Sequence, residues 1–429
     1  MYNPNEDPYF KKFLLNKDLA EDSIKTYANC AKVWYNILGK TIEETYKEIK
    51  PLQRDMIIDN YIIKYNPNDS IIKDYFDIFL SALLNEGKAD STIKFYIKVL
   101  RLILKDLEIE LPKAPKIKVK KKKKNIVLAK EDIKYIFSIS DIHYTALYCF
   151  LASTGIRITD AAKFSINDWL ASTYDYHHCN TLDEFMEKDH KDMIGYWEFY
   201  PKKTVNSSNF LCKVCNTPES NEYIKQSIYE RIRTIESKNK IHNTNISLAG
   251  EDPLFAVQKG YYKTRINREA VVVTSIKKNR KLQEKLKRDY ITQYENGEIN
   301  SVELDKLLKK RPKFHANALR HFFITTIRAY CSNRDISLKM EAHTSDIQTD
   351  ENYVGESKEL FSKDMIKKHY LEIINHLTFS VEIDPLELSE IERVRKENES
   401  LKEENIIIKN NIDMAVNDKI SEVLAKYGF

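Results

Sequence analysis

The chain has 429 residues, more than one hydrophobic core usually supports, so we expect at least two domains. A hydrophobic content of 42% is sufficient for packed cores and argues against wholesale disorder. Only 9 glycines are present and no G-x-x-x-x-G-K-[ST] string occurs, which excludes a P-loop ATPase. The net charge of +5 identifies no partner, because local charge creates the field that a ligand meets.

The start of the chain, MYNPNEDPYFKK, has no apolar segment of the kind found in secretory signals. No apolar run approaches the length of a membrane span. Six cysteines are scattered through the chain without a disulfide-like pattern. We therefore expect a cytoplasmic protein with free thiols and no contact with a membrane.

The N-terminal quarter of the chain has the apolar spacing of amphipathic helices, with apolar residues at i, i+3 and i+4. The pattern predicts an all-helical domain over residues 1–112. Its expected helices cover residues 10–15, 23–38, 54–63, 71–84 and 91–107.

The segment LPKAPKIKVKKKKKN then breaks the helical pattern with two prolines and a run of lysines. It predicts a linker over residues 113–125, either a solvated spacer or a basic strap along a phosphate backbone. The lysines that would contact DNA in the second interpretation are Lys116, Lys118, Lys120, Lys121, Lys122, Lys123 and Lys124.

The long middle region, residues 126–380, mixes helical patterns with short β-like runs and predicts a mixed α+β domain. The β-like runs cover residues 194–203 and 208–213 and flank a turn. A charged helical insert is expected over roughly residues 274–308.

The tail, residues 386–426, has a heptad pattern that predicts a C-terminal coiled coil. The a positions are Ile391, Asn398, Asn405 and Ile412, and the d positions are Val394, Leu401, Ile408 and Ala415. Four heptads are near the minimum for this prediction, so a single amphipathic helix packed on the body remains the alternative.

Three separated strings carry the side chains that could do chemistry. STGIRITDAAKF places Arg157 three residues before Asp160 at a helix–helix junction, where an exposed ion pair worth under about 1 kcal/mol is the simplest interpretation. HANALRHFFITTIRAY sets Arg320 within an apolar helix, where a guanidinium needs an anion or a carboxylate. AHTSDIQTDENY places His343 ten residues before Tyr353.

These strings, in this order, resemble the catalytic domain of the tyrosine recombinases, also called the phage integrase family. TGIRITD and NALRHFF resemble the two arginine motifs, and AHTSDIQTDENY resembles the segment from the histidine to the nucleophile. KKHYLEIINHLTF is similar to the tail of integrases from archaea and their viruses. The resemblance covers most of residues 10–379 and implies a core-binding (SAM-like) fold for the N-terminal domain.

The resemblance implies a DNA recombinase that needs no metal, cofactor or ATP. Tyr353 would attack the scissile phosphate and leave a 3′-phosphotyrosyl bond with a free 5′-hydroxyl. Arg157 and Arg320 would clamp the non-bridging oxygens, to which His343 would also donate. Asp160 would orient Arg157 without itself contacting the phosphate.

The resemblance also implies a lysine on a β-hairpin, which would protonate the leaving 5′-oxygen. In YPKKTVNSSNF this residue would be Lys203, with Lys202 as the alternative. Where the family usually has a histidine, three residues before its second arginine, this chain has Asn317. Asn can donate a hydrogen bond but cannot act as acid or base, and His315 could take that place.

Asn317 motivates a rival function, a non-catalytic DNA-binding or architectural protein that kept the fold. A type IB topoisomerase, which uses the same chemistry, is a second rival. One extra residue separates His343 from Tyr353 relative to the commonest family spacing, which leaves Tyr370 as an alternative nucleophile.

The partner that the resemblance implies is double-stranded DNA, bound by several protomers that form a tetramer in synapsis. Such a protein would be associated with the nucleoid and encoded by a virus or a mobile element. The CKVC string, Cys212 to Cys215, has zinc-ligand spacing, but no second C-x-x-C exists and only YHHCN offers further ligands. We therefore expect no metal site.

Overall fold

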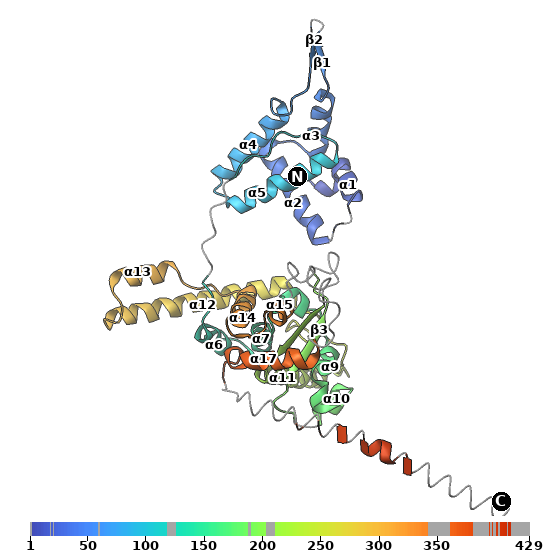
Figure 1. The fold of residues 1–429 in the computed structure, drawn as a ribbon, viewed down its shortest axis with the longest axis vertical. Coiled ribbons are helices and arrows are strands. Elements are labelled where there is room, and N and C mark those ends of the chain that lie inside the picture. Colours follow the sequence, from blue (N-terminus) through green and yellow to red (C-terminus); the bar gives the residue numbers. More distant parts are fainter. Residues whose placement is uncertain are drawn as a thin grey trace, which may run out of the picture. The chain divides into compact units, whose positions relative to one another are not determined.

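The computed structural model describes most of the chain. It covers residues 2–17, 19, 21–58, 61–117, 126–187, 190–202, 211–341 and 361–380, with residues 394, 397, 400, 401, 404–409, 411 and 412 of the tail. The chain divides into two compact units, Met1–Lys124 and Asn125–Phe429. Helices dominate both units, and a two-stranded sheet lies in the second unit (Figure 1), which confirms the predicted multidomain α+β class. Within the described ranges, no helix is both long and apolar enough to cross a bilayer.

The first unit is a helical domain packed around a single tryptophan. Its elements are η1 (Pro4–Glu6), α1 (Pro8–Leu15), α2 (Glu21–Leu38), α3 (Ile42–Ile49), η2 (Lys50–Leu52), β1 (Met56–Ile58), β2 (Tyr61–Ile63), α4 (Ile71–Asn85) and α5 (Asp90–Asp106). Trp34 is fully buried, with its ring 5.4 Å from that of Phe76 and its Nε1 donating to Thr45 Oγ1 at 3.1 Å. The amphipathic helices thus share one core.

The helix predicted over residues 54–63 is wrong, because β1 and β2 form an antiparallel pair there. Met56 lies opposite Ile63, and Ile58 lies opposite Tyr61. The β-branched isoleucines favour extended backbone, and the Asp-Asn dipeptide between them favours a turn. The prediction also missed α3, although its first turn carries a capping box.

The second unit contains the mixed α+β region. Its elements are α6 (Lys130–Ser138), α7 (Ile142–Thr154), α8 (Ile158–Ala161), α9 (Ile166–His177), α10 (Leu182–Met186), β3 (Gly195–Phe199), β4 (Cys212–Asn216), α11 (Pro218–His242), α12 (Arg268–Glu295), α13 (Ser301–Lys309), α14 (Ala316–Tyr330), α15 (Arg334–Met340) and α17 (Lys363–Leu377). The charged insert is confirmed as the antiparallel pair of α12 and α13 (Figure 1).

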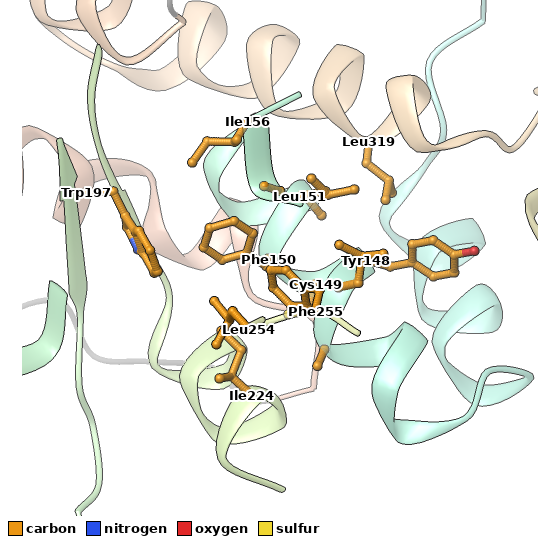
Figure 2. Close-up of a cluster of buried hydrophobic side chains, with 14 of the residues drawn as sticks. Tyr148, Cys149, Phe150, Leu151, Ile156, Trp197, Ile224, Leu254, Phe255 and Leu319 are labelled. Carbon is orange, nitrogen blue, oxygen red and sulfur yellow. The ribbon is translucent and has the colours of Figure 1, made fainter. Parts of the chain in front are cut away.

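Helix α7 is the centre of this second unit. Every residue from Thr145 to Thr154 is buried, and α11, α14 and β4 pack around the helix. Figure 2 shows Trp197 of β3 beside Phe150 on one side of α7. Leu319 of α14 lies on the other side of α7, near Leu151. Because α7 is covered on all sides, its C-terminal end has a fixed position from which the next residues emerge.

The predicted hairpin is confirmed as β3 and β4, which pair antiparallel from Gly195 opposite Asn216 to Phe199 opposite Cys212. β4 runs further than the predicted β-like run and includes the whole CKVC string. In the tail, the described residues between 394 and 412 are helical. The rest of the predicted coiled coil lies outside the described residues.

Candidate active site

The turn after α7 determines where the first arginine emerges. Gly155 ends α7 with a φ of 63°, and its N–H donates to the Leu151 carbonyl at 3.0 Å. A Cβ at this position would collide with the Phe323 ring of α14, so glycine permits both the left-handed turn and the close approach of α14. Arg157 follows in extended conformation as the N-cap of α8, with a half-buried side chain.

The second arginine, Arg320, lies in the interior of the unit and joins two helix ends. Its side chain is 6% exposed. Nη1 donates to the Gly155 carbonyl at 2.6 Å, and Nη2 donates to the Glu341 carbonyl at 2.5 Å. Burial and then the positive charge of Arg157 lower the pKa of Arg320 to about 10, which leaves it charged at neutral pH.

Arg157 and Arg320 are therefore neighbouring cations. In the described part of the chain, no carboxylate forms an ion pair with Arg157. Asp160, its expected partner, is buried and instead accepts the backbone N–H of Lys202 at 2.9 Å. Two guanidinium groups that repel each other, one of which forms no ion pair with a described carboxylate, make a site that favours an anion, and their planar forks match phosphate oxygens.

The loop end of the β3–β4 hairpin lies near this arginine pair, because the charges of Arg320 and Arg157 act on Cys212 at the start of β4. The Asp160–Lys202 hydrogen bond ties the strand that leaves β3 to α8. On the other strand, at the same end of the hairpin, Cys212 is buried and its Sγ donates to the Met340 carbonyl at 3.8 Å. Burial raises the pKa of Cys212 to about 12, so this thiol stays protonated and is not a nucleophile.

Glu341 is a positioning residue that the sequence analysis missed. Its buried carboxylate is bound by Arg328, from Nε to Oε1 at 2.7 Å and from Nη2 to Oε2 at 2.6 Å. The same residue presents its carbonyl to Arg320. Both contacts are tertiary, so no local sequence signal could have identified the role of Glu341.

Asn317, in the first turn of α14, forms a hydrogen bond with His321. Its Nδ2 lies 3.1 Å from Nε2 of His321, and because an amide nitrogen only donates, Nε2 accepts. His315 is the N-cap of α14, and partial burial followed by the charge of His321 lowers its pKa. The structure thus brings His321, which the sequence analysis did not propose, into contact with Asn317.

Several predicted site residues lie outside the described residues: Lys203, His343, Tyr353, Lys118, Lys120, Lys121, Lys122, Lys123 and Lys124. Lys116 is described and exposed, in the first unit. The alternative nucleophile, Tyr370, is fully buried and its hydroxyl donates to the Ser153 carbonyl at 2.8 Å. Burial also raises the pKa of Tyr370, so its hydroxyl is not available to a phosphodiester.

The CKVC string does not form a metal site with YHHCN in the described part of the chain. Cys212 and Cys215 are three residues apart on a strand, so their side chains point to opposite faces. His177 is already bonded through both ring nitrogens, to Thr173 Oγ1 at 3.1 Å and to the Cys179 N–H at 2.9 Å.

Comparison with known proteins gives similarity at the level of structure only. No protein-family model and no curated protein matches the sequence. Among solved structures the chain is similar to XerA recombinase (13% identity, TM-score 0.28), covering 85% of this chain and 97% of that chain. It is also similar to a lambda integrase dimer bound to a COC′ core site (12% identity, TM-score 0.43), and the match covers 82% of this chain and 95% of that chain.

A third similar structure is the Tn1549 transposon integrase in complex with transposon right end DNA, at 10% identity and a TM-score of 0.47, covering 85% of this chain and 98% of that chain. These neighbours are recombinases and integrases.

The role of Gly155 predicts a specific cost for adding one methyl group. Gly155→Ala should lower the free energy of unfolding by about 2–4 kcal/mol, because the left-handed turn is strained and the methyl meets Phe323. Gly260→Ala is the matched control, since Gly260 has a φ of 62° but no atom within 4 Å of its added Cβ. It should lose only about 1 kcal/mol. Urea unfolding of the full chain measures both, and equal losses would contradict the packing role of Gly155.

Proposed function

We propose that the chain is a site-specific DNA recombinase that cuts and rejoins DNA through a covalent 3′-phosphotyrosyl bond at Tyr353. The observation that carries the proposal is the pair of Arg157 and Arg320, whose positive charges repel each other, with no ion pair between Arg157 and a described carboxylate. Such a pair stabilises the negative charge that develops on a phosphoryl group during transfer.

Chain connectivity supports Tyr353 as the nucleophile of this site. The segment that contains His343 and Tyr353 begins after Glu341, whose carbonyl binds Arg320. It ends before Phe361, whose carbonyl accepts a hydrogen bond from Lys213 of β4 at 2.9 Å. Both ends are therefore anchored in the second unit. The eight residues from Phe361 back to Tyr353 span up to roughly 28 Å when extended, which supports access of Tyr353 to the arginine pair.

Each remaining residue has a role in the proposed reaction. Tyr353 would form the bond to phosphorus while the 5′-oxygen leaves and takes a proton from Lys203. Lys203 directly follows Lys202, which Asp160 holds beside α8, and this tether supports its placement. Asp160 therefore acts in the proposal by anchoring the hairpin rather than by binding Arg157.

Asn317 and His321, in the first turns of α14, would together take the role of the histidine that the family usually has. Asn317 can donate to a phosphate oxygen, and its partner His321 supplies an imidazole that can exchange protons. His315 stands at the same helix start. This arrangement favours a catalytic protein over the rival in which Asn317 marks a loss of activity.

Double-stranded DNA is the proposed partner, and α12 offers a surface for it in addition to the lysine linker. Lys277, Lys281, Lys287 and Arg288 are exposed and pair with no described carboxylate. The middle of α12 is bonded to the segment just before α14, because Asn279 Oδ1 accepts a hydrogen bond from the Phe314 N–H at 2.8 Å. A phosphate backbone could therefore extend from the arginine pair along this helix.

The cellular setting is proposed from the same function. A recombinase of this kind would be associated with the nucleoid in the cytoplasm and encoded by a virus or a mobile element. The similarity of KKHYLEIINHLTF to the tails of archaeal integrases motivates an archaeal or viral source. Recombination of two duplexes would require a tetramer in synapsis.

Covalent trapping on DNA tests the proposed function. Full-length protein is mixed with nicked duplexes that carry the ends of its own element, with EDTA present, and resolved on a denaturing gel. We expect an adduct from the wild type and from Tyr370→Phe, and none from Tyr353→Phe. Arg157→Lys should slow adduct formation by about 100-fold with DNA binding retained, because Lys keeps the charge but loses the planar fork.

The alternative outcomes separate the rival functions. Salt-sensitive DNA binding without any adduct would establish the non-catalytic DNA-binding protein instead. An adduct with relaxation of supercoiled DNA, but no joining of strands between duplexes, would indicate a type IB topoisomerase. An adduct that disappears in Tyr370→Phe alone would contradict the assignment of the nucleophile.

The tail is proposed to join copies of the chain through a coiled coil. Val394, Leu401 and Ile408 repeat every seven residues and are about half exposed, as is Ile412. An apolar stripe at heptad spacing is the surface that a second copy would cover. This exposure favours the coiled coil over the alternative of a helix packed on the body.

Charge placed in the stripe should therefore reduce the mass of the protein in solution. Ile408→Asp, at a d position, should shift the full-length protein from oligomer to monomer in sedimentation equilibrium. Ile407→Asp is the matched control, because Ile407 is equally apolar and 58% exposed but lies at a c position. An unchanged mass in Ile408→Asp, or an equal loss in both variants, would contradict the coiled coil.

A further inference from the structure

The C-terminal end of α14 meets α17 in a group of side chains that the proposed reaction does not use. Cys331 follows the last residue of α14, and His369 and Glu372 lie one turn apart on the same face of α17. One sulfur, nitrogen or oxygen atom from each lies within 4.8 Å of the others. In the part of the chain that the structure describes, no other group of three such residues is as close.

Ser332 holds His369 and Glu372 in place, while the Sγ of Cys331 donates to the Asn333 carbonyl at 3.3 Å. The Ser332 N–H donates to Glu372 Oε2 at 3.0 Å and its hydroxyl donates to Oε1 at 3.0 Å. The same hydroxyl lies 3.2 Å from His369 Nδ1, which is 2.9 Å from Glu372 Oε1. Hydrogen bonds of this kind orient ligands around protein-bound metals.

The chemistry of the three donors fits a borderline divalent cation. Zn²⁺ binds sulfur at about 2.3 Å and nitrogen or oxygen at about 2.0–2.2 Å, so tetrahedral ligands lie about 3.5 Å apart. Side-chain rotations that shift each donor by roughly 1 Å would close the observed group to that spacing. His369 is 8% exposed, whereas Glu372 lies at the surface, so a cation could enter from solvent.

We propose that Cys331, His369 and Glu372 form a site for Zn²⁺ or a similar divalent cation, with water as the fourth ligand. Binding releases the thiol proton of Cys331 to water, and the cation takes the place of the hydrogen bond between His369 and Glu372. No oxidation or reduction takes place. The site differs from the CKVC string that the sequence offered, because its ligands come from segments about forty residues apart that meet only in the folded unit.

A cation at this site would fasten α14 to α17. α14 carries Arg320, and α17 follows the segment that contains Tyr353, so the site would brace the helix that carries Arg320 without touching the reacting atoms. The site does not rest on the proposed recombinase function, since it would bind a cation even if Tyr353 formed no adduct.

Cobalt binding to the full-length protein tests the site, with Co²⁺ as the spectroscopic probe and Zn²⁺ as the competitor. We expect one Co²⁺ per chain, a thiolate-to-cobalt absorption band, and displacement of that band by Zn²⁺. Cys331→Ser should abolish the band, and Glu372→Gln should weaken binding at least tenfold. Glu236→Gln, which removes an exposed carboxylate on α11, is the matched control and should bind as the wild type does.

A thermal measurement separates loss of the site from loss of the fold. Zn²⁺ should raise the Tm of the wild type and of Glu236→Gln, and should leave that of Cys331→Ser unchanged. Absence of bound Co²⁺, binding without a thiolate band, or a band that persists in Cys331→Ser would each overturn the proposal.

Discussion

The second unit depends on the buried guanidinium of Arg320. Its two hydrogen bonds join the carbonyl that ends α7, 165 residues earlier in the chain, to the carbonyl of Glu341, 21 residues later. A buried cation is tolerated only where hydrogen bonds replace its hydration, and the two carbonyl groups supply part of that replacement. The same contacts fix the Gly155 turn from which Arg157 emerges and the point where the His343 segment begins.

This arrangement explains why two arginines, rather than lysines, suit the site. A guanidinium has five N–H donors in a planar fork, and the hydrogen bonds of Arg320 to described residues use two of them. The remaining donors and the half-buried Arg157 are suited to bind the oxygens of a phosphoryl group. The charge of Arg157 lowers the pKa of Arg320, and a bound anion would relieve this repulsion. Folding and the proposed chemistry therefore use the same side chain.

Sequence patterns predicted most of this architecture but not how the site is held together. Helical periodicity identified the helices of the first unit except α3, and failed at residues 54–63, where isoleucines on both sides of Asp-Asn fit a helix and a hairpin almost equally well. The arginine motifs identified Arg157 and Arg320. The contacts of Glu341, the Asn317–His321 pair and the hydrogen bond of Asp160 to Lys202 depend on tertiary packing, which periodicity and spacing do not encode.

The most direct test of the account is to locate the covalent bond to DNA within the chain. A trapped adduct would be digested with nuclease and trypsin, and its peptides would be examined by mass spectrometry. The tryptic peptide of residues 340–358 contains Tyr353 as its single tyrosine, whereas Tyr370 falls in the peptide of residues 369–393. The account predicts a 3′-nucleotidyl group on residues 340–358. The same group on any other peptide would contradict it.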